Sequence, residues 1–317
     1  MIKTDMTNII EIENLSKEYE TGFWKKKKTL ALDGVSLEVG PGQIFGFLGG
    51  NGAGKTTTIK ILMTLLFPTS GSAKILGRDI SEVDMHRRIG YSPENPYFYD
   101  YLTPRELLAY FADLFGHDRS KSKAHIDGLL TKVGLDEKDW NKQLRKFSKG
   151  MLQRVSIAQS IINGPEVVFM DEPMSGLDPI GRREIRELIA DLRSNGTTVF
   201  MSTHILSDVE ALCDEVAILR KGKLAATGKL DELLVAEGRE RTFEIIMKSI
   251  SKNELENSLS GIAGMAIEEH PSGVTVKVID ENDVDKVLAA ARKLGGRLIS
   301  VNIVKQSLEE LFVQETA

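Results

Sequence analysis

Apolar strands alternate with amphipathic helical segments along the first three quarters of the chain. Residues 9–19 alternate apolar and polar side chains as a half-buried strand does, and residues 35–49 contain two apolar runs separated by a Pro-Gly turn. The same reading predicts further elements in this order: a helix over 54–66, a short strand over 87–94, a helix-rich segment over 104–160, a buried strand over 165–173, a helix over 179–196 and a strand over 197–204. Strands that alternate with helices predict an α/β fold with a mixed, mostly parallel sheet.

The pattern changes beyond about Arg239, where the strands and helices become short. Strands are predicted over 242–248, 265–270, 274–280 and 297–304, with helices over 252–259 and 283–295 and a last segment at 307–314. This order resembles a small α+β sandwich of ferredoxin-like type. A chain of 317 residues is long enough for one large and one small domain, so we expect domains at 1–238 and 239–317.

The composition is that of an ordinary globular protein, with 41% hydrophobic residues. The net charge of −5 argues against nucleic acid as a partner. The single cysteine, Cys213, excludes an internal disulfide and fits a reducing cytoplasm; its surroundings predict the apolar face of a helix.

No signal-peptide pattern and no run of 18 apolar residues is present, so we expect any membrane role to come through a partner. The basic run Lys25–Lys28 is either a solvated loop tip or a contact for anionic lipid headgroups.

A glycine-rich segment, "GGNGAGKT", follows the second apolar run and precedes a predicted helix. It matches the phosphate-loop pattern G-x-x-x-x-G-K-[ST], in which backbone N–H groups and a helix N-terminus surround a phosphate chain. Lys55 would reach the β and γ phosphates, and the Thr56 hydroxyl would bind Mg²⁺. The expected nucleotide-binding residues here are Gly49, Gly50, Asn51, Gly52, Ala53, Gly54, Lys55, Thr56 and Thr57.

An acidic pair, Asp171 and Glu172, ends the predicted buried strand "VVFMDEP". A carboxylate at the end of a strand can hold Mg²⁺ through a bound water, which is the expected role of Asp171. Neighbouring strand residues face opposite ways, but a chain that turns after the strand leaves Glu172 free to polarise an attacking water. The pair and the phosphate loop together predict a nucleotide-hydrolysing site.

Three further motifs accompany these two. The segment "FSKGMLQR" (147–154) precedes the acidic pair by one helix, "SGLD" (175–178) follows it, and "MSTH" (201–204) ends the next strand. Over residues 9 to about 230 the ordered set resembles the motifs of ATP-binding cassette (ABC) ATPases, with "FSKGM" in place of the signature "LSGGQ". The resemblance implies a P-loop NTPase core with a helical lobe that carries the signature.

The resemblance also implies roles for single residues. Tyr19 would stack on adenine, His204 would hold the γ phosphate, and Glu94 stands where the family has a magnesium-sensing glutamine. Ser148 and Gly150 would contact the γ phosphate bound by a second copy of the chain, and Asp178 of "SGLD" would also face nucleotide. The expected catalytic residues are Glu172, His204 and Lys55, the expected metal ligands are Thr56, Glu94 and Asp171, and the cofactors are ATP and Mg²⁺.

Several positions depart from the family pattern. Gly50 replaces a common proline, which predicts a looser loop and some loss of nucleotide affinity. Phe147, Lys149 and Met151 differ from the strict signature, and Lys149 either adds positive charge toward phosphate or faces solvent. Glu94 supplies a carboxylate that can bind Mg²⁺ directly or through water.

The resemblance implies a homodimer that closes head to tail around two ATP molecules, together with an integral membrane permease at the cytoplasmic face of the membrane. The segments "FGFLG", "FSKGM" and "MDEPMSGLDP" and the tail ending in "SLEELF" resemble those of the daunorubicin-resistance-like, type 2 exporter branch. A ribosome-associated ABC ATPase and an importer ATPase are the alternatives. The loop holding Tyr91, Tyr97, Phe98, Tyr99 and Tyr101 is either core of the helical lobe or a groove for the permease. The C-terminal domain is expected to stabilise the dimer or the permease contact, or to be a passive stabilising module.

Overall fold

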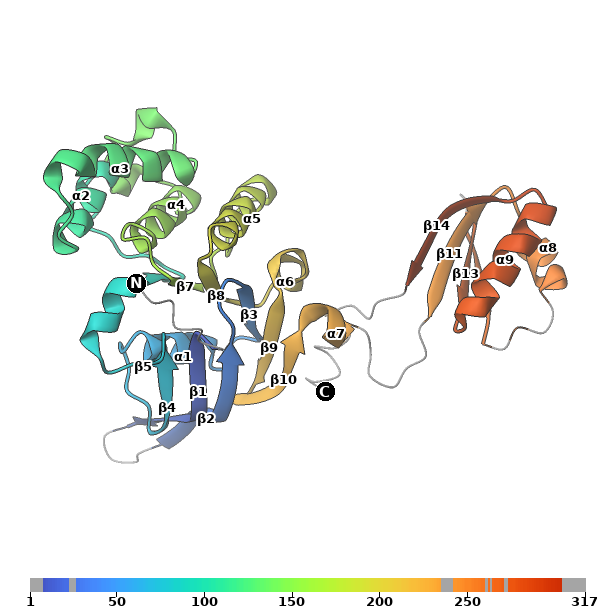
Figure 1. The fold of residues 1–317 in the computed structure, drawn as a ribbon, viewed down its shortest axis with the longest axis horizontal. Coiled ribbons are helices and arrows are strands. Elements are labelled where there is room, and N and C mark those ends of the chain that lie inside the picture. Colours follow the sequence, from blue (N-terminus) through green and yellow to red (C-terminus); the bar gives the residue numbers. More distant parts are fainter. Residues whose placement is uncertain are drawn as a thin grey trace. The chain divides into compact units, whose positions relative to one another are not determined.

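The computed structural model describes residues 8–22, 27–234, 242–259, 262, 264–270 and 273–303 (Figure 1). These residues form two compact units, which we call the first unit (8–230) and the second unit (231–303). The domain boundary expected between residues 238 and 239 lies in segment 235–241, outside the described residues.

A six-stranded sheet forms the centre of the first unit. Its strand order is β10 (Lys223–Lys229), β9 (Glu215–Arg220), β3 (Ile44–Gly49), β8 (Thr198–Thr203), β7 (Val167–Asp171) and β6 (Ile89–Ser92). All neighbours are parallel except β10 and β9. Every residue of β3, β7 and β8 is buried, as expected for strands covered on both faces. The predicted mixed, mostly parallel sheet is confirmed.

A second sheet in the first unit is antiparallel. Its order is β2 (Lys27–Val39), β1 (Ile10–Thr21), β4 (Ser70–Ile75) and β5 (Arg78–Asp79). The sequence pattern predicts β1 and part of β2 but not β4 or β5, which are short and polar. Lys28, in the basic run, pairs with Glu18 at 2.6 Å across β1 and β2.

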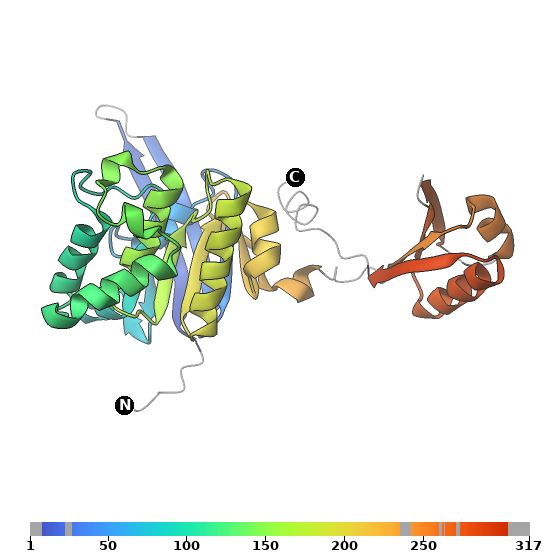
Figure 2. The same ribbon diagram turned by 90° about the horizontal axis from the view of Figure 1, so that it is seen from above.

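The helices of the first unit occupy two places. α2 (Pro104–Leu114), α3 (Arg119–Lys132) and α4 (Lys149–Ser160) pack together as the predicted helical lobe, with the short turns η2 (Glu137–Asp139) and η3 (Leu144–Lys146) between α3 and α4. α1 (Lys55–Leu62), η1 (Val83–Arg88), α5 (Pro179–Ser194) and α6 (Leu206–Leu212) lie outside the lobe. α7 (Leu230–Leu234) begins at the last residue of the first unit and continues into the second. Figures 1 and 2 show α5 against the six-stranded sheet, where it packs on β8.

The residues that precede α2 and α5 are of types that cap helix N-termini. α2 begins with a capping box, in which the Thr103 side chain accepts from the Glu106 N–H and the Glu106 carboxylate accepts from the Thr103 N–H, and Pro104 occupies the first turn. Asp178 caps α5 in a simpler way, by accepting from the Gly181 N–H at 3.0 Å.

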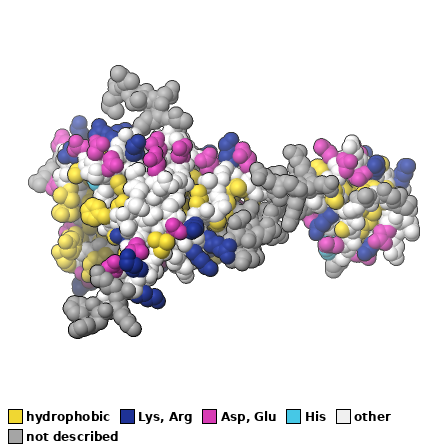
Figure 3. Space-filling view, turned by 90° about the horizontal axis from the view of Figure 1, so that it is seen from below, with side chains coloured by type: hydrophobic (Ala, Val, Ile, Leu, Met, Phe, Trp, Pro, Cys, Tyr) yellow, Lys and Arg dark blue, Asp and Glu magenta, His cyan; other side chains and the backbone are white. Residues whose placement is uncertain are grey.

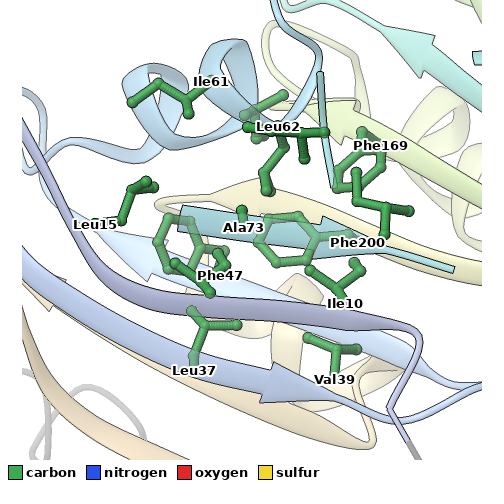
Figure 4. Close-up of a cluster of buried hydrophobic side chains, with 14 of the residues drawn as sticks. Ile10, Leu15, Leu37, Val39, Phe47, Ile61, Leu62, Ala73, Phe169 and Phe200 are labelled. Atoms are coloured by element: carbon green, nitrogen blue, oxygen red, sulfur yellow. The ribbon is translucent and has the colours of Figure 1, made fainter. Parts of the chain in front are cut away.

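The hydrophobic core joins both sheets and α1 (Figure 4). Phe200 of β8 lies at its centre, with ring centroids of Phe45, Phe47 and Phe169 at 5.3 to 5.5 Å. The labelled contributors are Ile10, Leu15, Leu37, Val39, Phe47, Ile61, Leu62, Ala73, Phe169 and Phe200. Aromatic packing at these distances holds β3, β7 and β8 together.

The second unit contains β11 (Phe243–Lys248), α8 (Lys252–Ser258), β12 (Ala266–His270), β13 (Gly273–Val278), α9 (Glu281–Lys293) and β14 (Arg297–Ile303). The strands form one antiparallel sheet in the order β12-β13-β11-β14. Its core includes Ile245, Met247, Leu255, Val276 and Val287. The last predicted segment, 307–314, lies outside the described residues.

The prediction that Cys213 lies on the face of a helix is wrong, because the helix ends one residue earlier. α6 ends at Leu212, Cys213 has an extended backbone, and β9 begins two residues later. The reason is tertiary pairing: Asp214 accepts the Ile44 N–H at 2.9 Å and so holds the chain in line with β3. The thiol is nevertheless buried, and burial raises its pKa above the ordinary value.

Because the buried Cys213 thiol stays protonated, we expect it to react slowly with a thiol reagent at about pH 8 and quickly once the chain is unfolded in denaturant. Absorbance from a disulfide reagent, followed with and without denaturant, measures both rates, and free glutathione serves as the reference thiol. Equal rates in the two conditions would show that the thiol is accessible in the folded chain.

Candidate nucleotide-binding site

The phosphate loop connects β3 to α1. Gly54 has φ +113°, and a Cβ there would lie 2.6 Å from Leu32 Cδ2 and 2.7 Å from the Ala31 carbonyl oxygen, so only glycine fits. α1 has no side-chain cap and no acidic residue in its first turn. Its N-terminus therefore keeps N–H groups and positive potential for an anion.

The loop borders a cavity of about 280 Å³. Segments distant in sequence meet around it: the lining residues are Ala31, Gly50, Asn51, Gly52, Ala53, Gly54, Lys55, Thr56, Thr57, Glu94, Glu172 and His204. All but Ala31 are expected from the sequence. Ala31 lies on β2, where its small apolar side chain carries no recognisable motif.

Lys55 is 7% exposed and has three partners within the site. Its ammonium nitrogen donates to the carbonyl oxygens of Gly49 at 2.6 Å and Gly50 at 3.4 Å, and it lies 3.3 Å from Glu172 Oε1. Gly49 does not line the cavity, but its carbonyl helps to position the lysine. These contacts hold the Lys55 ammonium group against the phosphate loop.

Glu172 has a left-handed backbone, with φ +50°, which is uncommon for a residue other than glycine. Its N–H donates to the Ser202 carbonyl at 3.1 Å and to Ser202 Oγ at 3.2 Å. The turn brings the carboxylate into the cavity, where Oε2 lies 2.9 Å from His204 Nδ1. The predicted turn after the strand is therefore present, whereas the role of Ser202 in holding it was not predicted.

Asp171, the last residue of β7, is 1% exposed and does not line the cavity. Ser202 Oγ donates to Asp171 Oδ1 at 2.5 Å, across the β7–β8 pair. Burial and the Asp171 charge together raise the pKa of nearby Tyr91 to about 12. Asp171 thus lies at the carboxyl end of β7, and β8 separates this strand from β3, which leads into the phosphate loop.

The proposed metal ligands Thr56, Glu94 and Asp171 all supply oxygen, the atom that Mg²⁺ prefers. Thr56 and Glu94 share the cavity, whereas Asp171 does not line it. Among the described residues no group of three or more His, Cys, Asp or Glu side chains is arranged to hold a metal ion. A set of few carboxylates suits Mg²⁺ that also takes phosphate oxygens and water as ligands.

Four other expected residues lie outside the cavity lining. Tyr19, on β1, is half-buried, and the Lys17 ammonium lies 5.4 Å from its ring centroid. Ser148 caps α4 by accepting from the Met151 N–H at 3.3 Å, and Asp178 caps α5. A Cβ on Gly150 would lie 3.3 Å from Leu177 Cδ2. None of these four residues lines the cavity at the phosphate loop of the same chain.

A glycine-rich loop between a parallel strand and a helix, with a lysine at the helix start and a buried aspartate at the end of a nearby strand, defines a P-loop nucleotide-binding domain.

Comparison with known proteins agrees with this class. A family model described as ABC transporter matches residues 32–175. An ABC transporter ATP-binding protein of Nostoc sp. is 43% identical over 309 residues, 97% of this chain and 90% of that protein. A fluoroquinolone export ATP-binding protein of Mycobacterium tuberculosis is 39% identical over 237 residues, 74% of this chain and 75% of its own. The chain belongs to the ABC transporter family, as an ATP-binding subunit and ATPase.

A solved structure agrees on the fold. The ATP-binding subunit of an ABC transporter superimposes with a TM-score of 0.62 and 32% identity, covering 71% of this chain and 91% of the solved chain. The predicted α/β fold class and the family resemblance are confirmed.

The substitution Glu172→Gln tests the catalytic role of this residue. We expect ATP turnover to fall by a factor of about 10² to 10⁴, because an amide cannot accept a proton from water, while ATP affinity is retained. Phosphate release and binding of a fluorescent ATP analogue measure the two quantities.

Glu187→Gln is the matched control, since Glu187 is exposed on α5 and pairs with Arg183. Wild-type turnover in Glu172→Gln would remove Glu172 from the mechanism.

Proposed function

We propose that this subunit drives export through a separate membrane permease, by ATP-dependent closure of two copies head to tail around two nucleotides. One observation carries the proposal: the cavity gathers the phosphate loop, Glu94, Glu172 and His204, whereas Ser148, Gly150 and Asp178 do not line it in the same chain. A second copy in head-to-tail orientation supplies these residues to each site. Hydrolysis then requires both chains.

The start of α4 has the chemistry that a phosphate requires. Ser148 Oγ accepts the Met151 N–H, so its own hydroxyl hydrogen stays available to donate to a phosphate oxygen. The first turn of α4 contains no acidic residue, and Ser148 and Lys149 are both exposed. Lys149 extends along Gly176 of the "SGLD" loop, which places its positive charge beside the segment that leads to Asp178.

Lys55, Glu172 and His204 have linked roles in this proposal. Lys55 and His204 both contact the Glu172 carboxylate, and both are suited to bind a γ phosphate. A γ phosphate competes with Glu172 for these two partners and so leaves the carboxylate to orient or deprotonate the attacking water. Mg²⁺ held by Thr56, Glu94 and Asp171 would neutralise phosphate charge, and Tyr19 would stack on adenine.

The permease would dock on the aromatic loop that follows β6. Tyr97, Tyr99 and Tyr101 are exposed, and the rings of Tyr99 and Tyr101 lie 5.9 Å apart. Large exposed aromatic side chains are typical of protein interfaces. The loop begins next to Glu94, so a partner on it lies close to the nucleotide.

Further apolar surface and one relative support a membrane permease as the partner. Figure 3 shows hydrophobic side chains gathered on one side of the first unit, and Phe67 and Val83 line an apolar cavity of about 370 Å³. In the part of the chain that the structure describes, no helix has the length and apolar character to cross a membrane. We infer export as the direction of transport because one relative is named as a fluoroquinolone export ATP-binding protein.

We infer a ferredoxin-like arrangement for the second unit, supported by its β-α-β-β-α-β element order and its sheet order β12-β13-β11-β14. The apolar side chains of Leu298, Ile299 and Val301 are exposed on the edge strand β14. We propose that residues 239–317 stabilise the dimer or the permease contact.

Mixing two inactive variants tests the shared site. Ser148→Arg keeps an intact phosphate loop and Lys55→Ala keeps an intact signature, so a dimer containing one of each has one complete site. We expect each variant alone to be inactive and an equimolar mixture to recover roughly a quarter of the wild-type turnover.

Mixing either variant with itself is the control. A mixture no more active than the sum of its components would contradict a site built from two chains.

The triple substitution Tyr97→Ala, Tyr99→Ala, Tyr101→Ala tests the docking surface. We expect it to reduce, by at least about tenfold, the recovery of the membrane subunit with the tagged chain from detergent-solubilised membranes, because hot-spot aromatics dominate interface energies. Tyr110→Ala, an exposed tyrosine on α2 outside this loop, is the control. Equal recovery in all variants would place the permease elsewhere.

A further inference from the structure

A buried charged group lies between α5 and α6, outside the cavity. Asp208, in the first turn of α6, is 1% exposed, and its Oδ1 lies 3.7 Å from Arg186 Nη1 on α5. Arg182, one helical turn earlier on α5, also acts on Asp208 with its positive charge. We call Arg182, Arg186 and Asp208 the interhelix charge cluster.

The pairing in the interhelix charge cluster is incomplete. A separation of 3.7 Å is too long for a hydrogen bond. Among the residues that the structure describes, two buried side-chain atoms lack a hydrogen-bond partner, Arg182 Nε and Asp208 Oδ2, and both belong to this cluster. Buried polar atoms are normally satisfied, so each unpaired atom calls for a functional or structural reason.

The negative charge of Glu172 also acts on the cluster. Burial raises the pKa of Asp208, the positive charges of Arg182 and Arg186 oppose this, and the negative charge of Glu172 raises the pKa further. The last effect means that Asp208 lies within electrostatic range of the proposed catalytic base.

The two helices lead to two parts of the shared site. α6 begins two residues after His204, which contacts Glu172. α5 begins directly after Asp178, in the loop that would face the second copy. A link between α5 and α6 therefore connects the His204 end of the site with the Asp178 end.

We propose that Asp208 is a positioning residue for ATP hydrolysis, which fixes α6 and His204 relative to α5 and Asp178 through Arg182 and Arg186. The inference rests on the proposed roles of Glu172, His204 and Asp178. Arg182 Nε can donate a hydrogen bond and Asp208 Oδ2 can accept one, so a direct bond between α5 and α6 would satisfy both unpaired atoms. The cluster thus favours one arrangement of the two helices, and this arrangement aligns the site.

A buried ion pair that served the fold alone would behave differently. Removing it would change the unfolding temperature and leave turnover of the folded enzyme intact. A positioning role instead lowers kcat with little change in the affinity for ATP, because nucleotide binding uses the phosphate loop and not this cluster.

The test uses the full chain carrying Asp208→Asn, Arg182→Gln or both, under the conditions in which the wild type hydrolyses ATP. We expect each single variant to lower kcat about tenfold with KM within about twofold of the wild type, and the double variant to lose little more, since both changes break one link. Asp208→Glu, which keeps the charge, should recover part of the loss.

Arg183→Gln is the matched control, because Arg183 lies on the same helix but is exposed and pairs only at the surface, with Glu187. Its kcat should equal that of the wild type. If Asp208→Asn does not fold, the kcat of Arg182→Gln is compared with that of Arg182→Lys instead. Because lysine keeps the positive charge, Arg182→Lys should lose less kcat than Arg182→Gln.

Wild-type kcat in the folded cluster variants, or losses that multiply independently in the double variant, would overturn the inference. Glu172→Gln, measured in the same assay, distinguishes failure of the positioning role of Asp208 from failure of the proposed catalytic role of Glu172. If it is inactive while the cluster variants are active, only the positioning role fails; if it is fully active, the proposed catalytic base itself is wrong.

Discussion

The contact of the Glu172 carboxylate with both Lys55 and His204 is the interaction on which the nucleotide site depends. Its two oxygens meet Lys55, at the start of α1, and His204, which follows β8. The contact requires a left-handed backbone at Glu172, which costs a non-glycine residue about 1–3 kcal/mol. Two hydrogen bonds from its N–H to Ser202 hold the chain in that conformation. Backbone strain at this point thus turns a residue that would otherwise continue β7 into a cavity residue.

The sheet explains why the charged groups gather at this edge. β3, β7 and β8 are buried along their whole length, so a charge within them would lack a partner. At their carboxyl ends the strands open into loops, where charges can pair with each other and with backbone groups. The Phe200 ring and its three aromatic neighbours hold the strands in place, and the β7–β8 register sets Asp171 opposite Ser202. The geometry of the site therefore depends on packing of the aromatic core.

Much of the fold and of the cavity could be predicted because the information is local. The phosphate loop and the strands around it follow from glycine spacing and apolar runs, and eleven of the twelve residues that line the cavity are expected from motifs. The roles of Ala31 and Ser202 could not be predicted, since both depend on which strands become neighbours. Long-range pairing also explains the error at Cys213, where Asp214 is held to β3 and the helix ends early. The positions of Ser148, Gly150 and Asp178 relative to nucleotide stay predictions, because they concern a second chain.

Two buried charged groups in the first unit differ in how well they are satisfied. Lys55 has two carbonyl oxygens and a carboxylate as partners, so its charge is compensated where it lies. Asp208 has an ion-pair contact at 3.7 Å and an unpaired oxygen, with an unpaired Arg182 nitrogen nearby. Buried ion pairs add little net stability, because desolvation offsets their attraction, but they do restrict geometry. Lys55 is therefore held where it lies by its three partners, whereas the interhelix charge cluster between α5 and α6 keeps one donor and one acceptor unsatisfied.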